Sequence, residues 1–328
     1  MNFDFTFECE ILHCSRHNFQ AFAGQLMIQG QDATAIPRFS IVIPVYNDWI
    51  PLDQCLQSLS QQHEAPSFEV ILVDDGSKQP VPEFIRTSAR AFPLEAIRQP
   101  HAGIPTARNR GIRACRGEVV LFVDADCKLR ADCLAILSST IAHSLQHDCF
   151  QLRLVGDPAS LVGRAEQLRL ITLQDHMLQT DGRIRYLNTA GFAIRRARTN
   201  IEAGLFNPAA LRAEDTLLLV NLMQRGELPL FIPEAIVEHV IPLSLLACLR
   251  KDVQSAYLER RAYEIIASMG IRIRATHRER LRMLMSMWKT AGEHSIGRLA
   301  WLLLVVRQAM QRAISFGYAA LPAGSGPG

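Results

Sequence analysis

A short apolar segment of the chain ends in two carboxylates. Residues 119–123 are all apolar, and Asp124 and Asp126 follow directly. A run of this length is typical of a strand buried on both faces of a parallel sheet, and ligands of open α/β sheets bind beyond the carboxyl ends of such strands. In extended chain the two carboxylates share a face, where hard oxygen donors would hold a divalent cation against a diphosphate. The alternative is a strand that ends in a solvated turn.

The elements that must position these carboxylates alternate between strands and helices from residue 37 onward. Strands are predicted over 39–45, 68–73, 94–98 and 119–123, with helices over 52–59, 81–91 and 105–114 between them. Strands that recur about every 25 residues with helices between them predict βαβα units, a parallel sheet and right-handed crossovers.

The second half of the chain is less regular. A strand is predicted over 189–196, an apolar helix over 217–223, and two short apolar segments on either side of Pro233. Beyond residue 242 the chain is predicted to be helical and basic to about residue 318, and the Pro/Gly/Ser-rich end is expected to be disordered.

Two phosphate-binding loops are absent from the sequence. No G-x-G-x-x-G follows the first predicted strand, and no G-x-x-x-x-G-K-[ST] occurs anywhere in the chain. The sequence therefore disfavours a dinucleotide-binding fold and a P-loop. Phosphate charge must be met by a metal ion and basic side chains instead.

The charge of the chain is unevenly distributed. The 328 residues carry a net charge of +3, which does not predict a nucleic-acid partner. Residues 250–312, however, contain 13 Lys and Arg and 5 Asp and Glu, which leaves the remainder of the chain acidic. A basic segment on an acidic body favours an anionic neighbour such as a membrane surface.

Three features bear on the cellular compartment. The eight cysteines form no metal-type C-x-x-C pair, which is typical of reduced thiols in a cytoplasmic protein. The N-terminal residues contain early acids and no basic start, so no signal peptide is expected. The longest apolar run, 299–306, is far shorter than the roughly 20 residues that a spanning helix needs. We expect a cytoplasmic protein, peripheral to the membrane where it contacts one.

Six segments taken together resemble the family 2 glycosyltransferases of the GT-A fold. They are residues 40–47, 73–77, 107–111, 122–126, 189–195 and 214–215, in the expected order over about 38–240. The resemblance implies an α/β fold with a mostly parallel central sheet flanked by helices. The expected organisation is an N-terminal extension (1–36), a GT-A catalytic domain (37–242), a basic amphipathic helical region (243–318) and a disordered tail (319–328).

The resemblance assigns one set of residues to the nucleotide-sugar donor. Pro44 and Tyr46 would border the nucleotide, and Asp75 would accept a hydrogen bond from the base, since a carboxylate can take a ring N–H. Arg108 would face the phosphates, and Gly191 would let the backbone approach the donor sugar. Uridine is favoured over other bases. The alternatives are a simple turn at Asp75 and a solvated helix charge at Arg108.

The resemblance assigns a second set to the metal and the chemistry. Asp126 would bind Mn²⁺ or Mg²⁺, Asp124 the ribose or the metal, and His239 would be a further metal or phosphate ligand. Asp215 would be the general base and Glu214 would position the acceptor or the loop. The alternatives are a structural histidine, and the general preference for acids in the first turn of a helix.

The implied activity is inverting, metal-dependent transfer of a single sugar to a hydroxyl acceptor in bacterial polysaccharide, glycolipid or glycoconjugate synthesis. The Q-x-x-R-W motif and the spanning helices of processive members are missing, which disfavours a polymerase. A sugar-1-phosphate nucleotidyltransferase would need a Gly-rich basic loop after the first strand, and residues 44–48 do not provide one. A non-catalytic nucleotide-binding or membrane-docking module is the other alternative, against which Asp126 and Asp215 argue.

The C-terminal region repeats apolar residues at helical spacing. The two stripes are Leu281, Leu284, Met285 and Trp288, and then Leu299, Leu302, Leu303, Val306, Met310 and Ala313. Such stripes pack either on the body of the protein or on lipid. The interleaved arginines and the two tryptophans at 288 and 301 fit a membrane interface, and a lipid-linked acceptor would explain both features.

Overall fold

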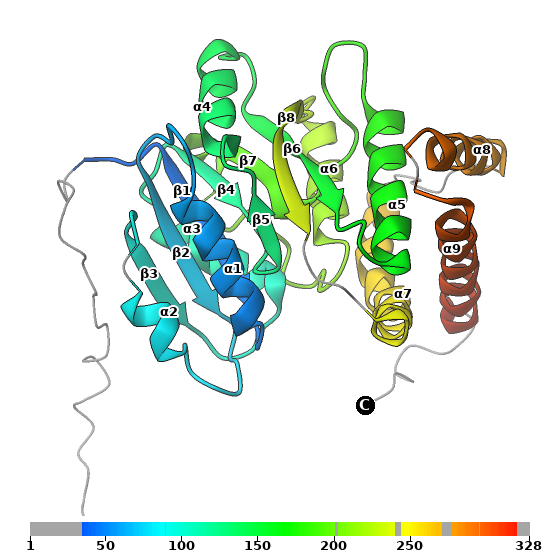
Figure 1. The fold of residues 1–328 in the computed structure, drawn as a ribbon, viewed down its shortest axis with the longest axis horizontal. Helices are drawn as coiled ribbons and strands as arrows, with labels where there is room; N and C mark the ends of the chain where they lie inside the picture. Colours follow the sequence, from blue (N-terminus) through cyan, green and yellow to red (C-terminus); the bar gives the residue numbers. More distant parts are fainter. Residues whose placement is uncertain are drawn as a thin grey trace, which may run out of the picture.

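The computed structural model describes residues 35–88, 90–200, 203–239, 244–270, 277–294 and 296–319. Within these residues one sheet contains eight strands in the order β3-β2-β1-β4-β7-β6-β8-β5, with helices on its faces (Figure 1). The strands are β1 (Phe39–Val45), β2 (Phe68–Asp74), β3 (Leu94–Arg98), β4 (Val119–Phe122), β5 (Cys127–Leu129), β6 (Cys149–Gly156), β7 (Phe192–Arg195) and β8 (Leu230–His239). Nearly all of the expected N-terminal extension and C-terminal tail lies outside the described residues.

The four strands predicted for the first half of the chain are confirmed. β3, β2, β1 and β4 are parallel neighbours. Every residue of β1, β2 and β4 is buried, as expected for apolar strands covered on both faces. The connecting helices are α1 (Trp49–Ser60), α2 (Glu83–Thr87) and α3 (Ile104–Ala114).

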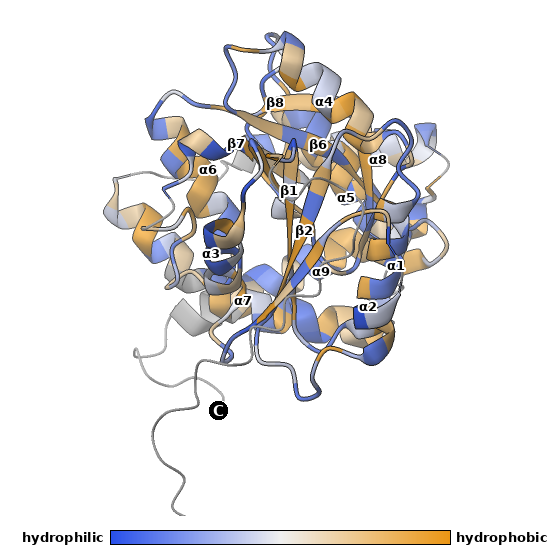
Figure 2. Ribbon diagram, turned by 90° about the vertical axis from the view of Figure 1, so that its left-hand side faces the viewer, coloured by the Kyte–Doolittle hydropathy of each residue, from blue (hydrophilic) through white to orange (hydrophobic). Residues whose placement is uncertain are grey.

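α1 and α3 cover opposite faces of these strands, as the edge-on view in Figure 2 shows. Leu56 of α1 packs in the same apolar cluster as Ile41, whereas Ala107 of α3 packs with Val42. Successive strand residues point to opposite faces, which explains the alternation. A Cβ on Gly111 would lie 2.4 Å from Cγ1 of Val42, so α3 can approach β1 this closely because the residue is glycine.

α2 is shorter than the helix predicted over 81–91. It spans five residues, and its flanking residues Pro82 and Ser88 both have extended backbone conformations. The ring of a proline disfavours a helical conformation for the residue before it, which keeps Val81 out of the helix.

The second half of the sheet is mixed. β7 is antiparallel to β4 and β6, and β8 is parallel to β6 and antiparallel to β5. The strand expected over 189–196 starts only at Phe192, because residues 189–191 form a 3₁₀ turn. The two segments beside Pro233 form one strand whose register jumps from Ile232 to Ile236. Residues 233–235 bulge out of the ladder, so the missing N–H of Pro233 leaves no ladder bond unmade.

The remaining helices cover the β6–β8 half of the sheet and its outer side. They are α4 (Cys133–His143), α5 (Leu161–Met177), α6 (Glu214–Gln224), α7 (Leu245–Ser268), α8 (His277–Glu293) and α9 (Arg298–Ala319). Figure 1 shows α5 between the sheet and the pair α8 and α9. The predicted helical region after residue 242 is thus confirmed. Among the described residues, no helix combines the length and the apolar character needed to cross a bilayer.

Candidate functional site

Parallel pairing brings the predicted segments to one edge of the sheet. Val45 of β1 pairs with Asp74 of β2, and β4 ends at Phe122 opposite Val42. The residues that follow each strand therefore gather at the carboxyl edge. Pro44 is buried near the end of β1, beyond the last residue that pairs with β4, so its missing N–H costs no ladder bond there. Its place beside a nucleotide stays a prediction.

The carboxylate of Asp75 organises the loop in front of α3. It is buried, and Oδ1 accepts hydrogen bonds from Gln99 Nε2 at 2.7 Å and from the backbone N–H of Ala102 at 2.9 Å. Oδ2 accepts from the backbone N–H of Gly103 at 2.9 Å. These bonds fix the entry to α3, so Asp75 has a structural task whether or not it binds a base. Base binding stays a prediction.

An exposed pair of rings lies against Asp75. Tyr46 and His101 stack with their centroids 4.3 Å apart and their planes 26° from parallel. Nδ1 of His101 is 2.9 Å from Oδ2 of Asp75. The flat ring of His101 thus stacks on Tyr46, which was predicted to border the nucleotide, and reaches Asp75, which was predicted to bind the base. No role was predicted for His101.

Arg108 is buried and joins three segments. Its Nη2 is 2.7 Å from Oδ1 of Asp124, and its Nη1 is 2.5 Å from Oε1 of Glu214. Although burial by itself lowers the pKa of a guanidinium, the two carboxylates raise the pKa of Arg108 above its usual value. A buried arginine is tolerated only when paired in this way. Arg108 therefore fixes both acids in place, and its predicted contact with phosphates stays a prediction.

A turn separates the two aspartates that follow β4. The backbone N–H of Cys127 donates to the carbonyl oxygen of Asp124 at 3.1 Å, so the chain is not extended here. Asp124 consequently turns to Arg108, and Asp126 turns to His239 on the strand paired with β5. The expectation that both carboxylates share one face assumed an extended chain and is wrong for this reason. The metal role of Asp124 stays a prediction.

Asp126 and His239 form a close pair that fits a divalent cation. Oδ2 of Asp126 is 3.0 Å from Nε2 of His239. Two ligands bound at about 2.1 Å and at right angles on an octahedral ion are about 3.0 Å apart. Among the described residues no three His, Cys, Asp or Glu side chains converge on one point, so phosphate oxygens and water would complete the coordination.

The pair is also held together electrostatically. Burial raises the pKa of the Asp126 carboxyl, but the hydrogen bond and charge of His239 lower it below its usual value. In return, burial lowers the pKa of His239 while Asp126 raises it to a net increase. The charge of Lys251, on α7, lowers the pKa of both groups. Lys251 is thus a cation within electrostatic reach of Asp126 and His239, whereas its place in the sequence indicated only the basic C-terminal region.

Asp215 stands in the first turn of α6 beside Glu214 but without a counter-ion. Its Oδ1 accepts from the backbone N–H of Thr216 at 2.6 Å, and among the described residues it has no ion-pair partner. Burial, followed by the charge of Glu214, raises the pKa of Asp215 to about 7. A carboxylate with this pKa takes up a proton readily at neutral pH, which is the property of a general base.

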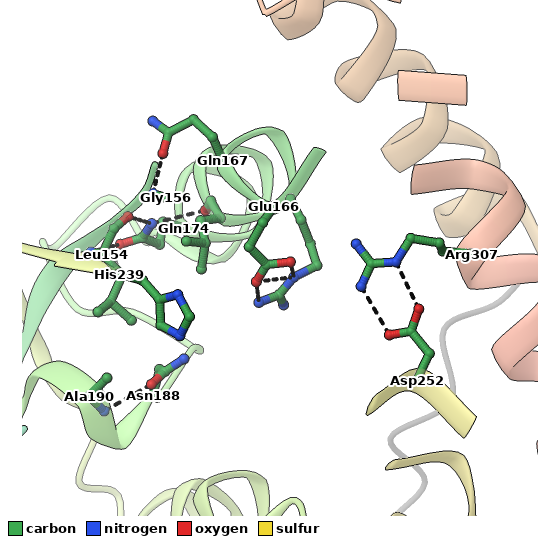
Figure 3. A network of polar contacts seen from close by, with 12 residues as sticks. Leu154, Gly156, Glu166, Gln167, Gln174, Asn188, Ala190, His239, Asp252 and Arg307 are labelled. Carbon is green, nitrogen blue, oxygen red and sulfur yellow. Dashed lines mark hydrogen bonds and ion pairs between the residues drawn. The ribbon is translucent and has the colours of Figure 1, made fainter. Parts of the chain in front are cut away.

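Helix α5 adds polar groups that the sequence did not reveal. Nε of Arg169 lies 3.0 Å from both carboxylate oxygens of Glu166, and Figure 3 shows Glu166 between His239 and the ion pair of Asp252 with Arg307. Burial raises the pKa of Glu166, but Arg169 lowers it to about 2. Burial lowers the pKa of Arg169, but Glu166 raises it to a net increase, to which the charge of Asp215 adds, so Arg169 and Asp215 lie within electrostatic reach. An (i, i+3) Glu–Arg pair on a helix gives no sequence signal beyond a solvated face.

Gly191 lies in the 3₁₀ turn before β7 and is buried. A Cβ there would lie 3.3 Å from Cβ of Leu152 and 3.5 Å from Cδ2 of Leu154, which are core side chains. Nε2 of Gln151 donates to the carbonyl oxygen of Gly191 at 3.0 Å, and its Oε1 accepts from the backbone N–H of Asn188 at 2.9 Å. Packing against these core side chains explains why residue 191 is a glycine. Its approach to the donor sugar stays a prediction.

Residues 40–201 match the family model described as glycosyl transferase family 2. The chain is 34% identical over 112 residues to the glycosyltransferase AglE of Haloferax volcanii, covering 33% of this chain and 37% of that protein. It is 38% identical over 92 residues to EpsJ of Bacillus subtilis, an uncharacterized glycosyltransferase, covering 28% of this chain and 26% of that protein. The matched region thus spans little more than a third of the length of these curated relatives at most.

Two solved structures share the fold. The mannosyltransferase PcManGT of Pyrobaculum calidifontis, in complex with GDP-Man and Mn²⁺, has a TM-score of 0.54 at 16% identity, with 89% of this chain and 82% of that chain covered. TarS 1–349 of S. aureus, in complex with UDP, has a TM-score of 0.51 at 17% identity, with 86% and 91% covered. The predicted GT-A fold is therefore confirmed: it is an α/β fold whose central sheet has parallel and antiparallel strands and is flanked by helices.

Proposed function

Residues 40–201 belong to glycosyl transferase family 2, and from this premise we propose that the chain transfers one sugar, with inversion, from a nucleotide-diphosphate sugar to an acceptor hydroxyl. The observation that carries the proposal is Asp215, a carboxylate that forms no ion pair with the described residues and whose pKa is raised to about 7 by burial and by Glu214. The pathway we propose is the synthesis of a bacterial polysaccharide, glycolipid or glycoconjugate. A relative of this chain, AglE, is a glycosyltransferase, which supports transferase activity.

The nucleoside would bind at Tyr46. The His101 ring already occupies the stacking position there, so a base would take that place or share Tyr46 with it. Stacking of a base on an aromatic ring contributes roughly 1–3 kcal/mol. The complexes of TarS with UDP and of PcManGT with GDP-Man support a nucleotide-sugar donor and leave the base open. Uridine remains our proposal.

Asp126 and His239 would hold the metal beside the diphosphate. A bound Mn²⁺ or Mg²⁺ supplies Lewis-acid chemistry that neutralises the leaving diphosphate. The 3.0 Å separation of the two ligand atoms supports this assignment, as does the Mn²⁺ in the PcManGT complex. Lys251 adds positive charge from α7 to the same region. The ion pair with Arg108 would set the position of the Asp124 carboxylate relative to the donor.

The chemical step uses Asp215 as the base. The acceptor oxygen forms a bond to the anomeric carbon while the bond from that carbon to the diphosphate oxygen breaks, and the electron pair leaves with the diphosphate. Positive charge develops at the anomeric carbon, as in glycoside hydrolysis. The acceptor proton passes to the Asp215 carboxylate. One direct displacement inverts the configuration, and Glu214 stays paired with Arg108 to hold the start of α6 in place.

The test is a panel of nucleotide sugars, each with Mn²⁺ or Mg²⁺, read as nucleoside diphosphate released and as product configuration. The key variant is Asp215→Asn, which keeps the shape of the side chain. A matched control is Asp132→Asn, because Asp132 is an exposed acid at the start of α4. We expect release by the wild type and the control and loss in Asp215→Asn. Formation of a nucleotide sugar with release of pyrophosphate from a nucleoside triphosphate and a sugar 1-phosphate, without sugar transfer, would overturn the proposal.

A further inference from the structure

The outer faces of α8 and α9 carry large apolar side chains that the described residues leave exposed. On α8 Met285 is 64% exposed, and on α9 Leu299 is 70% and Val306 is 54% exposed. The opposite faces of the two helices are covered, since Met287 and Leu304 are buried in a cluster with α5. Both faces of each helix are therefore apolar, and only one is used by the fold. Contiguous exposed apolar surface of this kind marks an interaction site.

The exposed residues form one row on each helix. Leu281, Met285 and Trp288 occupy positions i, i+4 and i+7 of α8, and Leu299, Leu302 and Val306 occupy i, i+3 and i+7 of α9. Residues at these spacings lie on one face of a helix. We refer to these six residues as the apolar rows.

The two rows meet at Trp288. Its ring contacts that of Trp301 edge-on, with centroids 4.9 Å apart, and the guanidinium of Arg298 lies 4.7 Å from the centre of the Trp288 ring. Arg298 directly precedes Leu299, the first residue of the second row. Figure 1 places α8 and α9 at one edge of the molecule, beyond α5. The rows therefore form parts of one outer surface.

Positive charge borders the apolar rows. Arg278, Arg282 and Lys289 are exposed on α8 at positions i, i+4 and i+11, which place them along one side of the row. One of them, Lys289, pairs with Glu293 at 3.5 Å. Across residues 277–319 the chain contains seven Lys and Arg and two Glu. Long basic side chains beside an apolar stripe, with tryptophan between, are typical of helices that lie in the headgroup region of a bilayer.

A second copy of the chain fits this surface less well than lipid does. In a symmetric dimer the same patch of each subunit meets itself, so the basic margin of α8 would face another basic margin. The bordering charge repels such a partner and attracts anionic lipid. Charge complementarity therefore favours anionic lipid over a second copy of the chain as the partner of the apolar rows.

We propose that the apolar rows and their basic margin dock on a bilayer that contains anionic lipid, with α8 and α9 lying along the membrane surface. The docking rests on the surface alone. That the same membrane presents a lipid-linked acceptor rests on the proposed sugar transfer.

Sedimentation of the full chain with vesicles tests the docking. The vesicles are phosphatidylcholine alone and phosphatidylcholine with about 30% phosphatidylglycerol, at about 50 mM and about 0.5 M salt. We expect binding to the anionic vesicles at low salt, at least about fivefold less binding to neutral vesicles, and a decrease at high salt, because salt screens surface charge. A wild type that stays in the supernatant with anionic vesicles at low salt would overturn the proposal.

Two double variants with the same charge change separate the rows from general effects. The first is Met285→Glu with Leu302→Glu; the control is Phe84→Glu with Leu145→Glu, which changes two exposed apolar residues on α2 and after α4. We expect about tenfold less vesicle binding in the first and unchanged binding in the control, with equal melting temperatures. Equal loss in both variants would contradict the proposal. So would a wild-type dimer, seen by sedimentation velocity, that only the first variant dissociates.

Release of nucleoside diphosphate from the donor, measured without acceptor or vesicles, keeps the two proposals apart. We expect this release to be the same in the wild type and in Met285→Glu with Leu302→Glu, because neither residue lies at the candidate site. Docking by a protein that releases no nucleoside diphosphate here, nor in the donor panel with an acceptor present, would sink the proposed function and leave the membrane surface standing. Release without docking would do the reverse.

Discussion

Asp215 and Glu214 are adjacent acids with opposite electrostatic surroundings. Glu214 is paired with Arg108, whereas Asp215 is half-buried and has no ion-pair partner among the described residues. Burial and the charge of Glu214 raise the pKa of Asp215 from its ordinary value of 3.8 to about 7. The residue that lacks a partner is therefore the one suited to accept a proton.

This pKa predicts the pH dependence of transfer. Below about pH 7 the Asp215 carboxyl is protonated and cannot act as base, so kcat/KM should fall about tenfold per pH unit on the acid side. The measurement is a pH profile of transfer with saturating metal, with donor affinity followed in parallel. A profile that is flat from about pH 5.5 to 8, with unchanged donor affinity, would exclude Asp215 as the base.

Asp215→Asn should separate catalysis from stability. An amide cannot accept the proton, so turnover should drop by about 10²–10⁴-fold with little change in donor affinity. The folded pKa of about 7 lies above the ordinary value of 3.8, so the folded state binds the proton more tightly. The stability that the protonated group contributes is fully present below pH 3.8 and is lost as the pH rises to about 7. The amide removes the negative charge. The melting temperature should therefore rise at pH 8 and stay level near pH 4.

A purely structural role of Asp215 predicts a different result for Asp215→Asn. If Asp215 serves only the first turn of α6, the substitution should lower the melting temperature slightly and leave turnover within about threefold of wild type. Glu214 or His239 would then be the next candidates for the base. Retention of configuration in the product would overturn the single displacement while leaving the fold and the metal pair standing.

Arg108 is predicted to be a positioning residue. Arg108→Lys keeps the charge, but an ammonium cannot bridge Asp124 and Glu214 as the guanidinium does. Breaking a buried ion pair costs about 3–5 kcal/mol, so unfolding by urea should occur at clearly lower concentration. Arg110→Lys, an exposed change on the same helix, is the control and should behave as wild type. Equal midpoints for the two variants would show that Arg108 is not structural.

At the scale of elements, Asn109 links α3 to the loop before α6. Its Oδ1 accepts from the backbone N–H groups of Leu205 and Phe206, both at 2.9 Å, and its Nδ2 donates to the carbonyl oxygen of Phe206 at 2.7 Å. The same helix contributes Arg108. Two residues of the 107–111 motif, Arg108 and Asn109, therefore tie α3 to segments that are far away in the sequence. The motif is explained by these links as much as by ligand contacts.

Asn109→Ala should therefore loosen that loop. The change leaves two backbone N–H groups without their acceptor, at a cost of about 1–3 kcal/mol each when they stay buried. Asn207→Ala is a suitable control, because Asn207 is exposed and, among the described residues, its side chain bonds only the nearby Ala209 N–H. Hydrogen exchange of residues 203–210 together with urea unfolding measures the effect. If both variants exchange alike, the Asn109 bonds do not hold the loop.

At the scale of the whole molecule, the proposed metal pair joins residues 113 positions apart, because β5 pairs with the end of β8. We predict that nucleoside diphosphate binding needs both a divalent cation and Asp126. Calorimetry of wild type and Asp126→Ala, each with and without Mn²⁺, measures this, with Asp132→Ala as control. We expect at least tenfold tighter binding with metal in the wild type alone, in keeping with charge neutralisation of the diphosphate. Equal affinity under all four conditions would refute the metal site.

The sequence determined the first half of the fold and the identity of the family. The strands predicted over 39–45, 68–73 and 119–123 are visible because parallel strands buried on both faces are largely apolar runs, and each run is followed by polar turn residues. The strand over 94–98 is mixed in polarity and is only partly buried. The helices after residue 242 are visible from their period. Local patterns of this kind depend only on which faces of a strand or helix are buried, and the spacing of apolar residues in the sequence shows this directly.

Only the tertiary structure decided which groups meet. No strand or helix was predicted over residues 127–188, yet this region supplies β6 and α5 and with them Glu166 and Arg169. The turn after Asp124 and the pairing of β5 with β8 placed Asp126 on His239, and burial placed Arg108 between two acids. Hydrophobic periodicity says that a face is apolar but not what covers it. For that reason the sequence showed the rows on α8 and α9, and only their packing on α5 showed that these rows remain exposed.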